Sequence, residues 1–358
     1  MIKETTPLKA PINHWNAMKN KDKFTKPISS DHDGLRFATP EIVAKYRARR
    51  LKCDFLADIS CGIGGQTIFF AKECKKVYAI EIDPVKIEHA KKNCQLYGVD
   101  NVEFICGDAL DPEIIHKLPE LDVVFSDPAR PPKEERRLIS SIRPSIEDII
   151  NAYSSRTKGF AFEVPPQLTP ERIPFDCEME YLSLNGKINR LTLYLNHLKK
   201  CDRSAITLPS EESLCGSGTG EIPESEIMKK FAYEPEPSVL KADLLPELAE
   251  KMSKGDNKTY LFRIDSKRAL MTSDEKLNSP LLKNQYIVLA ETKVSVKDIN
   301  SKLKELNAKN ALIRGKIDPD DYWNFRNRIE DGLNGDKAIH LYITDNSAII
   351  CQPLVEKD

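Results

Sequence analysis

From Cys53 onward, short apolar runs alternate with stretches that carry apolar residues at helical spacing. The runs have the length of buried strands, and they read DFLADIS, KVYAIEI, NVEFICG, LDVVFSD and, later, GFAFEVP. The helical stretches are Gln66 to Glu73, Pro84 to Tyr97 and Pro112 to Leu118. This alternation predicts βαβ units. The expected fold class is α/β, with a Rossmann-like, doubly wound and mostly parallel sheet.

Further elements are expected on either side of these units. Thr39-Pro40-Glu41 predicts a helix through Ala48, with Thr39 as the N-cap and Pro40 as the first helical residue. After GFAFEVP, the runs CEMEYLSL and RLTLYLNHL flank Asn185-Gly186, a pair that favours a tight hairpin turn. We expect this hairpin to finish the sheet.

The 358 residues are enough for two domains. We expect a basic N-terminal arm (1–36) and a Rossmann-like domain (37–206). The following segment (207–277) begins with many turn residues and is expected to be a linker and interdomain segment. The last segment (278–358) has the order strand, helix, strand, helix, strand, strand, which predicts a small α+β domain.

Composition narrows the class of protein. Hydrophobic residues make up 40% and charged residues 30% of the chain, as in a globular protein. The first 26 residues contain no apolar signal segment, and no later stretch approaches the ~20 apolar residues of a membrane span, so a cytoplasmic protein is expected.

The nine cysteines form no CxxC pair, and no histidine stands at ligand spacing beside them. We therefore expect neither a metal site nor a disulfide framework.

The clearest sign of a ligand site is the loop Asp58-Ile-Ser-Cys-Gly-Ile-Gly-Gly65, between the first apolar run and a helix. Its glycines let the backbone pass close to a ligand at a helix N-terminus. Glu81 ends the second run, Gly107-Asp108 follows the third and Asp127-Pro-Ala-Arg130 follows the fourth. Ligands of open α/β sheets bind at such strand ends. The series predicts a site for S-adenosylmethionine (SAM), and the glycine spacing does not fit the GxGxxG of dinucleotide enzymes.

Each strand end has an expected role toward the cofactor. Glu81 would accept hydrogen bonds from both ribose hydroxyls, with Asp83 in reserve. Asp108 would receive the adenine amino group, between apolar faces supplied by Ile82 and Ala109. The expected cofactor-binding residues are Asp58, Ser60, Cys61, Gly62, Gly64, Gly65, Glu81, Ile82, Asp83, Asp108, Ala109 and Asp127.

Asp127 and Arg130 are the expected catalytic residues. Asp127, held by Pro128, would hydrogen-bond the acceptor nucleophile or take its proton, and Arg130 would fix a phosphate or carboxylate. Transfer from a sulfonium is an in-line displacement, which needs positioning more than a covalent nucleophile. The alternatives are a turn or N-cap role for Asp127 and a surface ion pair for Arg130. Glu163 is a second candidate base, or simply a strand-end acid.

Several segments resemble known families. CGIGGQTIFFA, AIEIDPVKIEHAKKN and YGVDNVEFICGD resemble the SAM-binding core of the trimethylguanosine synthase family, and ATPEIVAKYRARR is similar in position. From about residue 37 onward the chain resembles prokaryotic methyltransferases that carry a THUMP-like C-terminal domain. The similarity lies in DPARP, in YEPEPSVLKA and in IRGKIDPDDYWNFRNRI followed by AIICQP. It implies a class I SAM-dependent methyltransferase with an RNA acceptor, because true THUMP domains bind RNA.

Two regions are candidates for contact with RNA. Residues 1–52 carry 12 Lys and Arg against 5 Asp and Glu, whereas 53–277 carry 30 against 38. A basic arm with interleaved aromatic residues suits phosphates and bases. In the last domain the basic residues are Arg314, Lys316, Arg326 and Arg328, close in sequence to the aromatic residues Tyr322, Trp323 and Phe325. In both regions the alternative is a solvated helix face over core aromatics.

We therefore expect direct SAM-dependent methylation of a base in a structured RNA such as tRNA or rRNA. One alternative is a methyltransferase for a small molecule or a protein, and another is a catalytically silent factor that binds SAM or RNA. The absence of a cysteine in the strand after the DPAR loop disfavours 5-methyluridine chemistry, which needs a covalent nucleophile.

Overall fold

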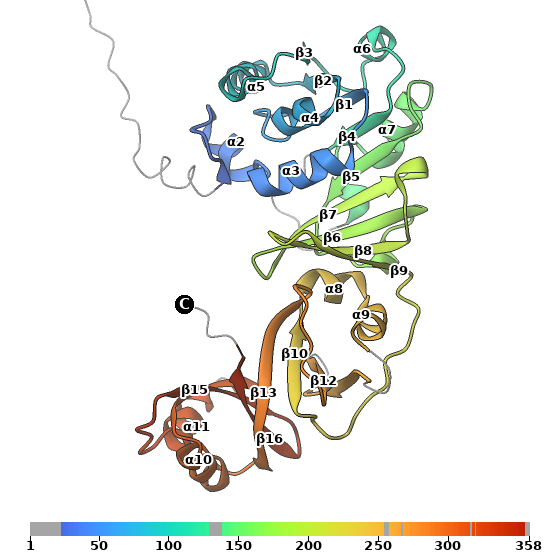
Figure 1. The fold of residues 1–358 in the computed structure, drawn as a ribbon. Coiled ribbons are helices and arrows are strands. Elements are labelled where there is room, and N and C mark those ends of the chain that lie inside the picture. The colour runs from blue at the N-terminus through green and yellow to red at the C-terminus, as the bar shows by residue number, and fades with distance from the viewer. Residues whose placement is uncertain are drawn as a thin grey trace, which may run out of the picture. The chain divides into compact units, whose positions relative to one another are not determined.

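The computed structural model describes residues 23–128, 138–253, 258–265, 268–315, 317–318 and 320–354. The chain forms two compact units (Figure 1). The first contains Met1–Glu178 and Leu191–Lys200, and the second contains Met179–Arg190 and Cys201–Asp358.

The first unit is built on five parallel strands: β1 (Phe55–Asp58), β2 (Lys76–Glu81), β3 (Val102–Cys106), β4 (Val123–Ser126) and β5 (Phe160–Val164). Their order in the sheet is β3-β2-β1-β4-β5, and all four neighbouring pairs are parallel. The order reverses between β1 and β4, which is the point where ligands bind in a doubly wound sheet. The predicted fold class is confirmed, because each apolar run forms the strand expected of it.

Two groups of helices pack beside these strands (Figure 1). In the first group, α3 (Glu41–Arg50) contacts α4 (Thr67–Glu73), and α4 contacts α5 (Pro84–Tyr97). In the second group, α6 (Pro112–Lys117) contacts α7 (Ile146–Tyr153). The apolar faces of the first group enclose a core with the strands, which includes Phe69, Phe70 and Phe125. A short helix, α2 (His32–Phe37), precedes α3.

One helix boundary differs from the prediction. Pro40, and not Thr39, occupies the N-cap position of α3, with no side-chain cap, and the helix continues to Arg50. In contrast, α5 begins and ends as expected. The Asp83 carboxylate accepts a hydrogen bond from the Val85 N–H at 2.8 Å, and Gly98 takes a left-handed φ of 71° at the C-cap, which glycine adopts without strain.

The predicted hairpin is present, but it does not finish the sheet. β6 (Cys177–Leu184) and β7 (Lys187–Leu195) are joined by Asn185 and Gly186, both at positive φ. Residues Leu191 to Leu195 of β7 pair antiparallel with β5. β6 also pairs in parallel with β8 (Arg203–Leu208), and β8 pairs antiparallel with β9 (Glu212–Gly216). Leu208 and Thr207 therefore belong to a strand and not to a linker.

The second unit also holds a seven-stranded sheet in the order β11-β12-β10-β13-β16-β15-β14. Its strands are β10 (Phe231–Pro235), β11 (Tyr260–Arg263), β12 (Ala269–Ser273), β13 (Leu282–Lys293), β14 (Ala308–Gly315), β15 (Lys337–Ile343) and β16 (Ser347–Pro353). Its helices are α8 (Pro237–Ala242), α9 (Leu245–Met252), α10 (Val296–Glu305) and α11 (Tyr322–Ile329). Short 3₁₀ turns occur in the chain at Ile139–Ser141, Pro170–Arg172 and Asn196–Leu198.

The expected linker over 207–277 therefore contains β9 to β12 with α8 and α9. β10 pairs antiparallel with both β12 and β13, so the α+β sheet begins well before residue 278. The strands in this segment are four or five residues long and lie between turns, which makes their hydrophobic pattern hard to recognise. The elements expected beyond residue 278 are all present.

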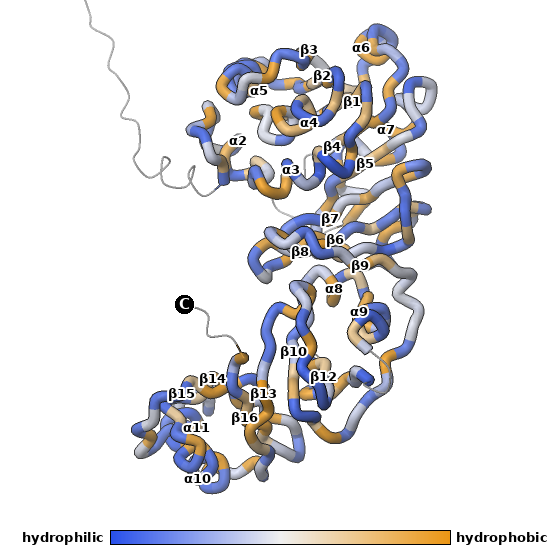
Figure 2. Tube along the Cα trace, in the orientation of Figure 1, coloured by the Kyte–Doolittle hydropathy of each residue, from blue (hydrophilic) through white to orange (hydrophobic). Residues whose placement is uncertain are grey.

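A second core lies between β13 to β16 and the two C-terminal helices. Ile299 and Leu303 of α10 and Ile329 of α11 pack with Leu341 and Ile350 of the sheet. Figure 2 shows apolar and polar positions mixed along α10 and α11, as expected for helices that bury one face. Within the described ranges, no helix combines the length and apolarity needed to cross a membrane.

Candidate active site

The glycine loop folds tightly against the ends of β1 and β2. The Gly62 N–H donates to Glu81 Oε2 at 2.9 Å, and the Cys61 N–H donates to the Ile80 carbonyl at 3.1 Å. Gly64 has a φ of 80°, and a Cβ there would lie 3.1 Å from the Ala90 backbone on α5. Only glycine avoids both the strain and the contact, so Gly64 sets how closely the loop approaches α5.

Asp58 ends β1 as a buried carboxylate that is 1% exposed. Oδ2 accepts a hydrogen bond from the Thr67 hydroxyl at 2.6 Å, while Oδ1 is buried with no hydrogen-bond partner among the described residues. Burial, to which the charge of Glu81 adds, raises the pKa of Asp58 to about 6. A buried oxygen without a donor is costly, so this atom is suited to a ligand that brings a donor or a positive charge.

Glu81 and Asp83 have different tasks. The two carboxylate oxygens of Glu81 accept from the N–H groups of Gly62 and Asp83, at 2.9 and 3.2 Å, and its side chain is partly exposed. Asp83 caps α5. Because the cap occupies Asp83, Glu81 remains the better candidate for the ribose hydroxyls.

The expected adenine pocket is open on one side. Ile82 is 67% exposed directly after β2, an arrangement that leaves an apolar surface for a ring. The exposed Asp108 carboxylate accepts from the Leu110 N–H at 2.9 Å. Ala109 is buried, and its carbonyl accepts a hydrogen bond from the Tyr153 hydroxyl at 2.7 Å. Ile82 and Asp108 are thus accessible, whereas Ala109 belongs more to the wall beneath them.

Asp127 lies at the end of β4, beside the glycine loop. Its backbone N–H donates to Ser60 Oγ at 2.7 Å, so Ser60 links the first and fourth strand ends. The Asp127 side chain is partly exposed. Pro128 is buried, and Arg130 lies outside the described residues. The two predicted groups at the β1 and β4 ends, Ser60 and Asp127, therefore meet.

Glu163, the second candidate base, is in a buried ion pair that the sequence analysis missed. Its Oε2 lies 2.6 Å from an Nη atom of Arg47, and the two side chains are 4% and 2% exposed. Arg47 was expected in the basic arm that faces phosphates. The signal lay in the helical spacing of Val43, Arg47 and Leu51, which places Arg47 on the buried face of α3.

Two other basic residues of α3 also contact acids of this chain. Lys45 Nζ lies 2.6 Å from Glu41, and Arg50 lies 2.9 Å from Glu178. Glu41 accepts from Tyr97 and Thr25 as well. Although burial opposes ionisation, the hydrogen bonds to Lys45 and Thr25 lower the Glu41 pKa to about 2. Much of the positive charge counted in residues 41–52 is therefore neutralised within the chain.

In the second unit, some of the predicted aromatic and basic residues are exposed to solvent, whereas Phe325 packs on the core. Trp323 is 64% exposed, with the Arg326 guanidinium 5.6 Å from its ring centroid. Phe325 packs on the core of α10 and α11. The alternative that placed both rings in the core is thus wrong for Trp323. Arg314 and Arg328 are exposed, and Lys316 lies outside the described residues.

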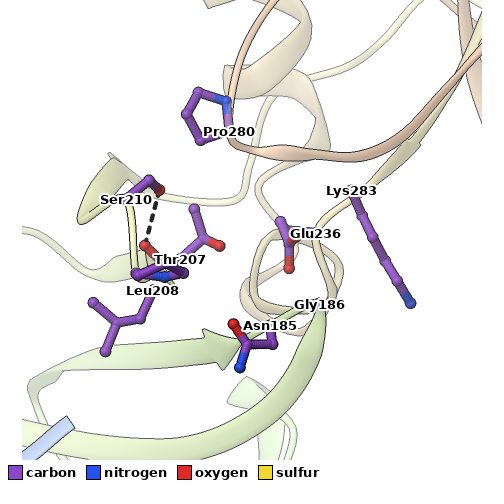
Figure 3. Close-up of a pocket in the computed structure, with 9 residues that line it drawn as sticks. Asn185, Gly186, Thr207, Leu208, Ser210, Glu236, Pro280 and Lys283 are labelled. Carbon is purple, nitrogen blue, oxygen red and sulfur yellow. Dashed lines mark hydrogen bonds between the residues drawn. The ribbon is translucent and has the colours of Figure 1, made fainter. Parts of the chain in front are cut away.

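The second unit also contains a hollow of about 370 Å³ (Figure 3). The turn Asn185-Gly186, the strand end at Thr207 and the residues Glu236 and Lys283 contribute to its wall. Figure 3 shows the Asn185, Thr207 and Glu236 side chains around the same space. None of the residues predicted to bind a cofactor lines this hollow.

The strand-end residues of the first unit fit SAM. Glu81 would hold the ribose, and the exposed Ile82 would cover the adenine. The methionine part would then extend toward β1, where Asp58 offers a buried carboxylate oxygen without a donor. SAM carries an ammonium and a sulfonium charge, which suit this acid. Bound SAM would supply an activated methyl group.

Comparisons with known proteins bear on the class of enzyme. The family described as RNA cap guanine-N2 methyltransferase matches residues 53–133, which include the glycine loop and all the strand-end acids from Asp58 to Asp127. Over 340 residues the chain is 24% identical to an uncharacterized SAM-dependent methyltransferase of Mycobacterium tuberculosis, which covers 90% of this chain and 88% of that protein. The chain is a SAM-dependent methyltransferase.

Two further comparisons bear on parts of this methyltransferase. It is 40% identical over 110 residues to the trimethylguanosine synthase of Schizosaccharomyces pombe, an alignment that spans 29% of this chain and 46% of that enzyme. A crystal structure from Porphyromonas gingivalis W83, described as a methyltransferase, matches with a TM-score of 0.74 at 16% identity. That match covers 91% of this chain and 83% of the other, and it supports the fold of both units.

Proposed function

We propose that this SAM-dependent methyltransferase transfers the methyl group directly to a base of a structured RNA, such as tRNA or rRNA. The observation that carries the proposal is the position of Asp127. A polar, partly exposed carboxylate follows β4 at the switch side of the sheet, and its backbone is held by Ser60 of the cofactor loop. A carboxylate placed there can accept a hydrogen bond from the N–H of an attacking amino group.

The choice of RNA is supported by the relatives. The matching family is described by its action on the guanine of an RNA cap, and the S. pombe relative is a trimethylguanosine synthase. In the second unit, which we interpret as THUMP-like, the exposed ring of Trp323 lies beside the guanidinium of Arg326, which is partly buried and ion-paired with Glu330. Such pairs stack on unpaired bases. Arg130 and the arm before residue 23 would add contacts to phosphates.

Direct transfer assigns limited tasks to the protein. The chain has to hold SAM, exclude water and bring the acceptor nitrogen in line with the methyl group. Asp127 would orient that nitrogen and take up its proton after or during transfer. Neither task requires a covalent intermediate.

The test is methyl transfer from radiolabelled SAM to RNA isolated from cells that lack the gene. We expect label in the RNA fraction, in one modified nucleoside after digestion. Asp127→Asn should lose at least about a hundredfold in rate. Label that appears only in protein or in small molecules would contradict the RNA acceptor. Full activity of Asp127→Asn would contradict its role.

A further inference from the structure

We propose that Cys53 and Cys74 form an oxidative modification site, at which hydrogen peroxide converts two free thiols into one reversible disulfide. The two sulfur atoms lie 3.8 Å apart, close to van der Waals contact, and neither cysteine is bonded to another. No CxxC spacing marks this pair in the sequence, because the fold brings together residues that are 21 positions apart. The inference goes beyond the methyltransferase reaction and does not depend on the acceptor.

The backbone around the pair has the spacing that a disulfide needs. β1 and β2 pair in parallel with Phe55 opposite Lys76, and the Lys76 N–H donates to the Asp54 carbonyl at 2.9 Å. Continued two residues toward the amino ends, this register places Cys53 opposite Cys74. Paired strands lie about 4.8 Å apart, which is within the roughly 4.4–6.8 Å that separates the Cα atoms of disulfides. The bond therefore requires the sulfurs to approach but the two segments to stay where they are.

The surroundings of the pair favour its oxidation. Cys53 is partly exposed, whereas Cys74, the C-cap residue of α4, is buried. The Cys74 thiol donates to the Leu51 carbonyl at 3.9 Å, and a hydrogen bond from Cys53 lowers the pKa of Cys74, although burial opposes this. Loss of one proton thus leaves a thiolate that the remaining S–H stabilises, and the thiolate is the reactive form of cysteine. The exposed side of Cys53 is where a small oxidant reaches the pair.

The oxidation is balanced with hydrogen peroxide as the oxidant. The thiolate attacks one oxygen of the peroxide, the O–O bond breaks, and the leaving hydroxide takes up the released proton as water. The sulfur of the second cysteine then attacks the sulfenic acid. An S–S bond forms, the S–O bond breaks and a second water leaves. The two thiols together lose two electrons, one peroxide becomes two waters, and a thiol reductant reverses the bond.

The disulfide would close a loop that contains β1, the glycine loop and α4. Cys53 precedes β1, and α4 returns from the glycine loop to end at Cys74. The cross-link therefore lies at the amino end of β1, whereas the cofactor residue Asp58 lies at its carboxyl end. A cross-link restricts the unfolded chain more than the folded one. Oxidation thus stabilises this segment and leaves the cofactor end unchanged.

The test uses the full-length protein with Cys106 and Cys215 replaced by serine. Among the residues that the structure describes, these two cysteines are the exposed ones, so their removal limits disulfides between molecules. Cys74→Ser in this background removes one member of the pair. Cys94→Ser is the matched control, because Cys94 is also buried and belongs to the same core as Cys74.

The first readout is peptide mapping after brief treatment with hydrogen peroxide, removal of the peroxide by catalase and alkylation of the remaining thiols. We expect a cross-linked product of the Cys53 and Cys74 peptides, lighter than the two thiol peptides by two hydrogen atoms. It should form in the background protein and in Cys94→Ser, and dithiothreitol should release it. Recovery of both cysteines as alkylated thiols or as separate oxidised acids would overturn the proposal, as would Cys53 linked mainly to another cysteine.

The second readout is urea unfolding of the oxidised protein before and after dithiothreitol. The disulfide should lower the equilibrium constant for unfolding by roughly a hundredfold, and dithiothreitol should reverse this gain. Any methionine sulfoxide needs its own reductases and remains in both samples. Cys74→Ser should show no reversible gain. A midpoint that the disulfide leaves unchanged or lowers would overturn the proposal, because the fold would then not accommodate the bond.

The third readout locates the effect. The SAM affinity, measured by calorimetric titration, should agree within about threefold between the oxidised and the reduced protein. A loss of about tenfold or more that dithiothreitol reverses would contradict a bond whose effect is confined to the amino end of β1.

Discussion

Asp58→Asn should make the cofactor-free protein more stable and the cofactor bind less tightly. Asp58 is buried, and its pKa is raised from 3.8 to about 6. A difference of about 2 pH units, at about 1.4 kcal/mol each, corresponds to about 3 kcal/mol between the charged and neutral forms. At pH 8 the folded protein without SAM therefore contains an ionised Asp58 carboxylate, although burial favours its protonated form.

The sign of the pH dependence follows from the direction of that change. Because the folded-state pKa is higher than the unfolded one, the stability contributed by Asp58 is complete below about pH 4 and is lost as the pH rises through about 6. Asparagine has no such titration. Relative to the wild type, Asp58→Asn should gain up to about 3 kcal/mol between pH 4 and pH 8.

The assay is urea unfolding of both proteins at pH 4.5, 6 and 8 without SAM, combined with calorimetric titration of SAM at pH 8. We expect the stability difference to grow with pH and the SAM affinity of the variant to fall at least about tenfold. The wild-type affinity for SAM should itself decrease below pH 6, as Asp58 becomes protonated. A stability difference that does not change with pH, or an unchanged affinity, would refute the reasoning about the Asp58 carboxylate.

Three other substitutions test separate contacts. Glu81→Ala should reduce SAM affinity at least about tenfold, and retained affinity in titration calorimetry would remove the ribose assignment. Glu41→Gln should lower the free energy of unfolding by about 2 kcal/mol at pH 7. Because the Glu41 pKa is lowered to about 2, this difference in the free energy of unfolding should shrink as the pH falls from 4.5 toward 2. Urea unfolding at several pH values would measure it. Gly64→Ala should weaken SAM binding and destabilise the fold more than Gly98→Ala, since both have positive φ but only Gly64 faces the Ala90 backbone at 3.1 Å; equal Tm losses would contradict this.

The parts of the fold that could be predicted are those with a strong local pattern. The strands β1 to β5 are continuous apolar runs, because both faces of a parallel sheet are buried. The ends of α5 were recognisable from Asp83, Pro84 and Gly98, which each have a specific backbone role. The strand-end acids followed from the topology, since parallel strands bring their carboxyl ends to one edge.

The parts that were missed depend on tertiary contacts. β10 to β12 are short and separated by turns, so neither their existence nor their pairing with β13 is visible in a local window. Arg47 shares the helical spacing of the buried Val43, but the partners that allow a charged residue to be buried there, Glu163 and Thr192, lie far along the chain. Trp323 is an exception, because local spacing already places it off the helix face of Tyr322, Phe325 and Ile329, and it is 64% exposed.

The contacts of α3 also set an order of events during synthesis. Thr192, which accepts from Arg47 of α3, lies 145 residues further along the chain than Arg47. At about 5–20 residues per second, the ribosome needs roughly 7–30 s to make that stretch. During this time α3 can already pack on α4, but the Arg47 side chain lacks its contact with Thr192. The polar contacts that bury Arg47 are thus completed only when β7 has been made and has paired with β5.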